Sequence, residues 1–220
     1  MKVLELDARE WRSADDAFDA LLEALGAPDW HGHDLDALND SLQGGDLNAI
    51  NPPLTIHVTN LEAASAMARV TAWRMRHLCV ELTKNGIALA WSSFVDERTD
   101  DAVAALEEFR GAALQKEQRI NAGDASQDAA LHATMADRLR QLFELGAAGL
   151  DCIEALLHDE RPEVASWIAA ELAARGDHRG ASVLQTLAGL PGSMGFSARM
   201  TLNELRKGQL RSPFGLSKRI

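Results

Sequence analysis

The stretch that decides the interpretation of this chain is residues 29–46, Asp29-Trp30-His31-Gly32-His33-Asp34-Leu35-Asp36-Ala37-Leu38-Asn39-Asp40-Ser41-Leu42-Gln43-Gly44-Gly45-Asp46. It contains five carboxylates and no Lys or Arg. A helix that begins after Asp34 places its leucines on one side, because residues three and four apart are neighbours on a helix. Asp36, Asn39 and Asp40 then share another side. We therefore expect a short helix, anchored by leucines, that presents unneutralised acids to something positive.

Length and charge restrict the class of protein. The chain has 220 residues and a formal net charge of −11. Residues 1–94 carry 14 acids and 7 bases, whereas residues 95–220 carry 19 acids and 15 bases. A negative field disfavours direct nucleic-acid binding and favours a basic protein partner. No apolar run approaches the ~18 residues that span a membrane.

The cysteines and the N-terminus indicate a compartment. Cys79 and Cys152 lie in apolar helical patterns, so we expect buried free thiols in a reducing cytoplasm. The first residues are too polar for a signal peptide. The sequence therefore predicts a cytoplasmic protein with no contact to a membrane.

The N-terminal part alternates between strand-like and helical patterns. The strand-like runs are 2–6, 54–58 and 87–91, and the helical patterns are 13–25, 35–43 and 61–84. Ser13 and Asp34 are expected N-caps, and Gly26 follows the end of the first helix. Strands that alternate with helices favour a small three-stranded parallel sheet with packed helices.

After residue 92 the pattern becomes helical. Expected helices cover 100–119, 128–145, 148–157, 164–175, 179–190 and 197–207, with a linker at 121–126. We therefore expect an α/β domain at 1–94, a connecting helix and linker at 95–122, and an all-helical, helical-repeat-like domain at 123–220. Residues 209–220 are expected to form an extended or frayed tail.

The segment Gly32-His33-Asp34-Leu35-Asp36-Ala37-Leu38-Asn39-Asp40-Ser41-Leu42, within this βαβαβ-like layout, carries a family resemblance. Residues 1–94 resemble the barstar family, intracellular inhibitors of a secreted bacterial ribonuclease. Pro28 and Trp30 precede the glycine at the family's spacing. Glu81 lies five residues before Gly86, where these inhibitors place an acid that faces the enzyme. The resemblance implies an inhibitor that binds a basic ribonuclease or toxin.

The resemblance also implies roles for the acids and for two neighbours. Asp40 matches the carboxylate that enters the phosphate pocket of the nuclease. Asp36 matches a second acid on the same surface, and Glu81 matches a peripheral acid. Trp30 matches a contact aromatic that is normally a tyrosine. Gly44 matches a loop glycine where the backbone meets the partner.

Two positions depart from the family pattern. Asn39 and Gly45 stand where the prototype of the family has aromatic residues. Aromatic side chains are favoured interface anchors, so their loss removes apolar contact area. The acidic helix itself is retained. We therefore include Asn39 among the partner-binding residues, with a reduced apolar contribution.

Residues 123–210 resemble a HEAT-like helical domain. The resemblance rests on the segment Asp159-Glu160-Arg161-Pro162-Glu163-Val164, which is similar to the turn of such repeats. Ala169, Ala170 and Leu172 then follow as in the second helix of such repeats. Ala165 stands where an arginine is common. This resemblance implies a fold but no chemistry, and it supports an alternative function as a protein-binding adaptor that acts through the helical domain.

Several polar and aromatic residues have a second interpretation. His31 and His33 lie near three aspartates and could suggest a zinc or manganese site, but no third ligand has a fixed spacing, so polar loop histidines are expected. Glu81 could also be a simple exposed acid. The tryptophans expected in the core are Trp11, Trp73, Trp91 and Trp167. No Walker loop, dinucleotide fingerprint or nucleophile elbow occurs, so we expect no enzyme, no cofactor and no metal.

Overall fold

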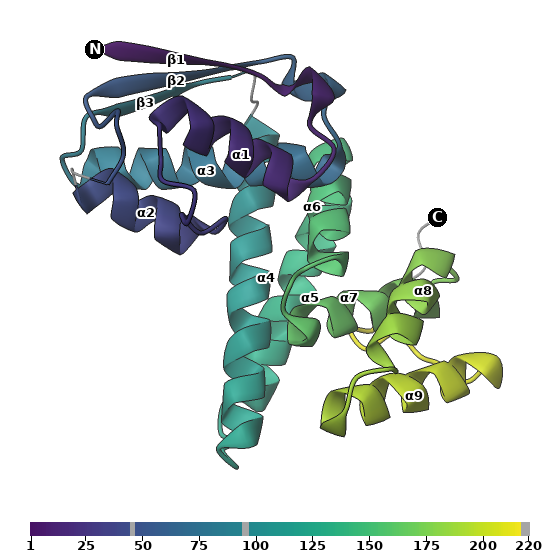
Figure 1. Ribbon diagram of the computed structural model, residues 1–220. Helices are drawn as coiled ribbons and strands as arrows, with labels where there is room; N and C mark the ends of the chain where they lie inside the picture. The colour runs from purple at the N-terminus through teal and green to yellow at the C-terminus, as the bar shows by residue number, and fades with distance from the viewer. Residues whose placement is uncertain (45–46, 94–96, 217–220) are drawn as a thin grey trace. The chain divides into compact units, whose positions relative to one another are not determined.

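The structure, a computed structural model, describes residues 1–44, 47–93 and 97–216. It divides into two compact units, Met1–Val103 and Ala104–Ile220. The division lies within helix α4 (Glu97–Asn121), inside the segment that was predicted to connect the two parts. The predicted order, an α/β part followed by a largely helical part, is confirmed (Figure 1).

A three-stranded parallel sheet forms the base of the first unit. It contains β1 (Lys2–Asp7), β2 (Leu54–Thr59) and β3 (Leu89–Ser92) in the order β1-β2-β3. The predicted strands are confirmed, although the third begins later than expected. Alternate residues are buried on one face, as the period of a strand requires: Leu4, Leu6, Leu54, Ile56, Val58 and Leu89.

Three helices lie together on one side of this sheet (Figure 1). They are α1 (Ala14–Leu25), α2 (Leu35–Gly44) and α3 (Ala66–Lys84). Ser13 begins α1 with a capping box, in which its hydroxyl accepts from the backbone N–H of Asp16 and the Asp16 carboxylate accepts from that of Ser13. Gly26 ends α1 in the left-handed conformation, with φ of 63°. These local signals explain why the predicted bounds of α1 are confirmed.

The predicted helix over 61–84 is wrong at its N-terminal end. A 3-10 turn, η2 (Leu61–Ala63), comes first, and the backbone is extended at Ala64 and Ser65. The Ser65 hydroxyl accepts a hydrogen bond from the backbone N–H of Ala68, which begins α3 at Ala66. The apolar spacing was correct, but the capping preference of Ser65 interrupts the helix. A second 3-10 turn, η1 (Ala8–Glu10), follows β1.

The second unit consists, in its described residues, of the rest of α4 and five further helices. They are α5 (Asp128–Glu144), α6 (Ala147–Leu157), α7 (Pro162–Ala174), α8 (His178–Leu187) and α9 (Gly192–Arg206). All were expected, but α9 begins five residues before the predicted start at 197. The likeness to HEAT repeats stays a prediction.

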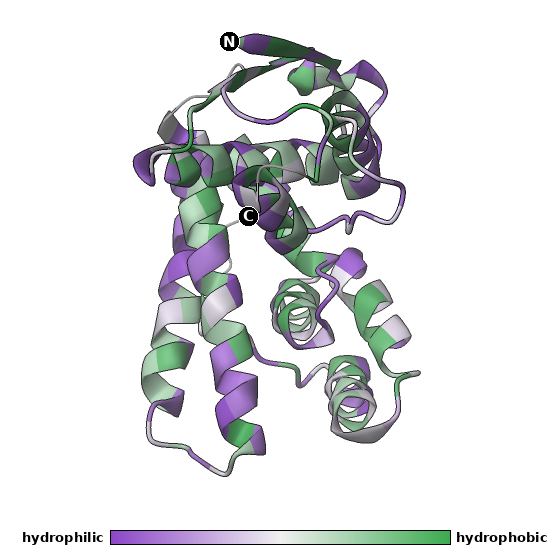
Figure 2. Ribbon diagram, turned by 60° about the vertical axis from the view of Figure 1, so that its left-hand side comes forward, coloured by the Kyte–Doolittle hydropathy of each residue, from purple (hydrophilic) through white to green (hydrophobic). Residues whose placement is uncertain are grey.

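Ion pairs and close backbone contacts hold these helices together. Helices α4 and α5 form a hairpin, and two ion pairs join them, Lys116–Asp128 and Glu108–Arg138. Both hydrophilic and hydrophobic residues occur along this hairpin (Figure 2). Helix α8 packs tightly on α7 at Gly180, where an added Cβ would lie 2.4 Å from the carbonyl oxygen of Ala169. Only glycine permits this approach.

The tail at residues 209–216 has neither helix nor strand, as an extended arm would, but the prediction of fraying is wrong. Phe214 is buried, and its ring packs against Phe109, His132 and Trp167. The Ser212 hydroxyl donates to the fully buried Glu171 carboxylate at 2.6 Å. Phe214 supplies an apolar anchor, and the buried carboxylate needs donors, so the tail folds back onto its unit. Residues 217–220 of this prediction lie outside the described part of the chain.

Candidate functional site

Helix α2 has a buried side and an exposed side, as its sequence predicts. Leu38, Ser41 and Leu42 are buried, whereas Asp36 and Asp40 are exposed. The Asp34 carboxylate accepts a hydrogen bond from the backbone N–H of Ala37 at 2.7 Å, which confirms Asp34 as the N-terminal capping side chain. The buried face fixes the helix on its unit, and the outer face carries the acids.

The surroundings of Asp36 and Asp40 decide whether their charges are available to a partner. Within residues 1–44, 47–93 and 97–216, neither forms an ion pair with a Lys or Arg. Asp40 has a long hydrogen bond of 3.5 Å from the side-chain amide of Asn39, which itself accepts from Gln43 at 2.8 Å. Many other acids of the chain are paired with arginine or lysine, as Asp100 is with Arg76. The two charges on α2 are therefore available to a partner.

The neighbouring predicted residues are also accessible. Trp30, in the turn before α2, is 74% exposed, which is unusual for the largest apolar side chain. Gly44, the last residue of α2, is exposed, and Asn39 is half-buried. The structure thus places Trp30, Asp36, Asn39, Asp40 and Gly44 on α2 or its preceding turn. Gly45, predicted as a departure from the family pattern, lies outside the described residues.

Glu81 has a different environment from the two acids on α2. It lies near the end of α3, and its carboxylate accepts a hydrogen bond from Lys84 at 2.6 Å. This bond, with added attraction from the charges of Lys84 and His77, lowers the pKa of Glu81. Within the described residues no hydrogen bond or ion pair joins Glu81 to Asp36 or Asp40. Its own neighbour therefore offsets much of its charge.

The two histidines before α2 do not behave alike. His31 is buried, contrary to the expectation of a polar loop residue, and its Nδ1 lies 2.8 Å from the carbonyl oxygen of Gly32. His33 stacks on Phe18, and its ring nitrogens lie 3.6 Å from Asp15 and 3.3 Å from Asp19. The contact with α1 was missed, although the i, i+4 spacing of Asp15 and Asp19 was a possible signal.

Metal and thiol chemistry gain no support from the described residues. Over that part of the chain, no group of three or more His, Cys, Asp and Glu side chains is placed to hold a metal ion. Cys79 and Cys152 are buried thiols, as predicted, and neither forms a disulfide bond within the described residues. Burial raises the pKa of the Cys79 thiol to about 12, so this group is not an activated nucleophile.

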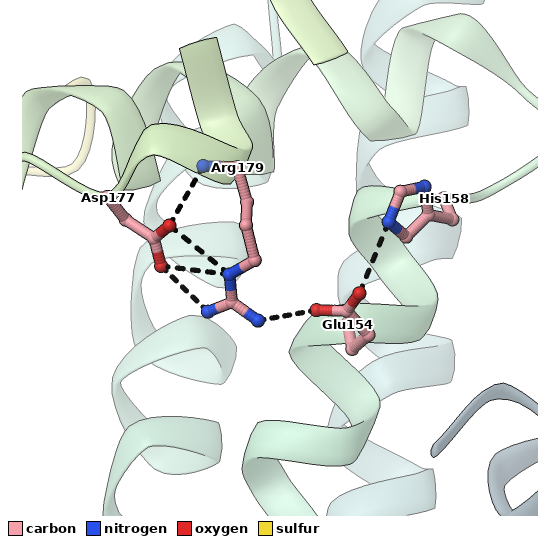
Figure 3. Close-up of polar contacts among 4 residues, drawn as sticks. All are labelled: Glu154, His158, Asp177 and Arg179. Carbon is pink, nitrogen blue, oxygen red and sulfur yellow. Dashed lines mark hydrogen bonds and ion pairs between the residues drawn. The ribbon is translucent and has the colours of Figure 1, made fainter. Parts of the chain in front are cut away.

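A second polar cluster lies in the helical unit, and its charged side chains pair with one another (Figure 3). The Arg179 guanidinium donates to Asp177 at 2.7 Å and to Glu154 at 2.6 Å, and His158 lies 3.2 Å from the other Glu154 oxygen. The hydrogen bonds from Arg179 lower the pKa of Asp177. Because Arg179 pairs with both carboxylates, we interpret this cluster as a structural link between α6 and α8.

The fold and the site together define a class of protein module. A small parallel sheet, covered by helices on one side, holds a short helix whose exposed carboxylates lack a basic partner in the described chain. Such a module suits the binding of a cationic surface.

Comparison with known families agrees with this class. Residues 1–86 match the family of barstar, the barnase inhibitor. This supports a barstar domain at the N-terminus, and barstar is an inhibitor family and not an enzyme family. No curated protein matches the chain. Over the described residues, no helix has both the length and the hydropathy that crossing a membrane requires.

Proposed function

We propose that the barstar domain of this chain binds a ribonuclease or a similar basic toxin and blocks its phosphate-binding active site. The observation that carries this proposal is the pair of exposed carboxylates, Asp36 and Asp40, which have no Lys or Arg partner among the described residues and lie on a well-anchored helix inside a barstar domain. Immunity of the producing cell against its own or a rival's toxin is the role that such an inhibitor would serve.

The chemistry of the target explains why carboxylates suit this task. A ribonuclease stabilises a negatively charged transition state with preorganised cationic groups. The Asp40 carboxylate would occupy the phosphate position and accept charge-assisted hydrogen bonds from arginine, which are bidentate in favourable geometry. It cannot be cleaved as RNA can. The enzyme therefore remains blocked for as long as the complex lasts.

The other predicted residues have secondary roles in the proposal. Asp36 adds attraction at the edge of the contact and mainly accelerates association. Glu81 contributes less than Asp36, because Lys84 is already bound to it. Trp30 supplies the exposed aromatic contact, which gains weight because Asn39 stands where the prototype of the family has an aromatic residue. Gly44 allows the partner to approach the end of α2.

Inhibition of a barnase-type ribonuclease by the full chain tests this proposal. Cleavage of a fluorogenic RNA is followed while wild-type protein, Asp40→Ala or Glu62→Ala is titrated into the enzyme. Glu62 is an exposed acid in η2, so its removal changes the net charge equally and serves as the control. We expect the wild type and Glu62→Ala to inhibit alike and Asp40→Ala to inhibit far less.

Two results would contradict the proposal in different ways. Equal inhibition by Asp40→Ala and the wild type would refute the phosphate-mimicking role of Asp40. Failure of the wild type to inhibit would refute a barnase-type enzyme as the target. In that case binding by the helical unit, the adaptor alternative, would become the better explanation, and a chain that ends at residue 93 would lose its partner.

A further inference from the structure

Helix α9 carries an exposed apolar and basic face in an otherwise acidic chain. Its inner side, with Gly195, Ala198 and Leu202, is buried against the unit. Phe196 and Met200, one turn apart, are 61% and 45% exposed. Because residues four apart are neighbours on a helix, these two side chains form one exposed apolar patch.

Basic residues accompany this apolar pair. Residues 192–216 contain four basic residues and one acid, whereas residues 1–86 contain seven basic residues and 14 acids. Arg206 and Lys207, at the end of α9, are exposed, and neither forms an ion pair within the part of the chain that the structure describes. Most other arginines and lysines of the helical unit are paired, for example Arg110 and Arg179. We call Phe196, Met200, Arg206 and Lys207 the α9 face.

The chain itself carries a surface of complementary character. Asp36 and Asp40 are exposed acids without basic partners in the described residues, and Trp30, in the turn that precedes α2, is 74% exposed. Both surfaces thus combine an exposed aromatic side chain with exposed charges. The charges on the α2 surface are negative, and on the α9 face the two bases Arg206 and Lys207 outnumber the one exposed acid beside them, Glu204. Pairing the two surfaces would bury apolar area and neutralise the charges together.

We propose that the α9 face binds the α2 surface of a second copy of this chain. A nucleic acid fits the face less well, because the net charge of −11 repels polyanions and a phosphate backbone offers no apolar partner for Phe196 and Met200. The contact joins two different surfaces, so copies associate head to tail, as a closed reciprocal pair or as an open chain. A basic toxin that binds α2 would then compete with self-association.

This inference shares the α2 surface with the proposed function but does not depend on ribonuclease inhibition. Analytical ultracentrifugation of the full chain, from micromolar to submillimolar concentration, measures it. We expect wild-type self-association that weakens with added salt. The Arg206→Glu/Lys207→Glu variant should raise the dissociation constant about tenfold or more, equivalent to about 1.4 kcal/mol. The control, Arg140→Glu/Arg161→Glu, makes the same change of net charge at exposed positions outside α9 and should leave the constant unchanged.

A charge exchange makes the test specific. The Asp36→Lys/Asp40→Lys variant should also fail to self-associate, but its mixture with Arg206→Glu/Lys207→Glu should form complexes again, because the reversed charges match. Circular dichroism of each variant checks that the helices are retained. Restored association in the mixture supports the inference.

Several outcomes would overturn it. They are a wild-type chain that stays monomeric at all concentrations, equal loss of association in the control variant, and a mixture that remains monomeric. Binding of single-stranded RNA by the wild type, lost in Arg206→Glu/Lys207→Glu without any self-association, would assign the α9 face to nucleic acid instead. Ribonuclease inhibition, measured on the same proteins, separates the two proposals, since only the α2 variants should lose it.

Discussion

Replacing Asp40 by asparagine should affect the fold and the complex in opposite directions. In the free protein the Asp40 carboxylate is exposed, has no Lys or Arg partner among the described residues, and lies four residues after Asp36 on the same helix. Like charges at this spacing destabilise a helix by about 0.2–0.5 kcal/mol. Asp40→Asn removes the repulsion and keeps the size of the side chain. We expect the free energy of unfolding to stay equal or to rise by up to about 0.5 kcal/mol.

The effect on the complex should be much larger. If Asp40 meets the cationic cleft of the target, its neutralisation leaves buried basic groups of the partner without their anion. Truncating one member of such a pair costs about 2–5 kcal/mol. At 1.4 kcal/mol per factor of ten, the dissociation constant should rise from roughly 30-fold to a few thousandfold. Urea unfolding measures the first quantity, and inhibition titration or calorimetry measures the second.

Either half of the result can refute the reasoning. Destabilisation of the free protein by more than about 1 kcal/mol would show that the Asp40 carboxylate is held by the fold, since surface substitutions usually change stability by less than about 0.5 kcal/mol. An unchanged dissociation constant would remove Asp40 from the interface. Glu62→Gln, an exposed acid of the same unit outside α2, is the matched control for both measurements.

Three further predictions concern stability of the helical unit and are checked by chemical or thermal unfolding. Glu171→Ala should destabilise the chain by about 3 kcal/mol, because it leaves Arg175, which donates to the buried carboxylate at 2.7 Å, without its anion; no loss would mean that this pair is replaceable. Phe214→Ala should also cost about 3 kcal/mol, because it removes a buried ring from an aromatic cluster, and an unchanged midpoint would show a detached tail. The lowered pKa of Asp177 implies that its contribution to the free energy of unfolding is complete above about pH 4, the ordinary pKa, and is lost as the pH falls through the pKa of the folded state. Asp177→Asn should therefore weaken the loss of stability at acid pH. An unchanged dependence of stability on pH in this range would contradict the prediction.

Local signals in the sequence predict much of the first unit. The capping pattern at Ser13, the left-handed Gly26 and the alternation in β1 and β2 each depend on residues close together in the chain, so their elements are where they were expected. The error at the start of α3 arose because only apolar spacing was used to place it. Apolar spacing continued through 61–65, but Ser65 makes a capping hydrogen bond that spacing does not reveal.

Some features of the candidate site can also be predicted from the sequence, and others cannot. Helical periodicity alone determines that Asp36 and Asp40 share a side of α2 opposite Leu38 and Leu42, because the helix repeat places them there. Only the folded chain shows that these acids stay unneutralised within the described residues. That property depends on where the distant lysines and arginines lie. Glu81 is the contrasting case, because its basic partner Lys84 lies only three residues later on the same helix.

The sequence by itself therefore determined most of the helices and strands, the caps at Ser13 and Asp34 and the acidic face of α2, because backbone geometry relates residues a few positions apart. The tertiary structure decided which polar groups are paired, that His31 is buried, and that Phe214 packs against Phe109 and Trp167. These contacts join residues far apart in the chain. Their partners are chosen by the packing of whole elements, which no local pattern records.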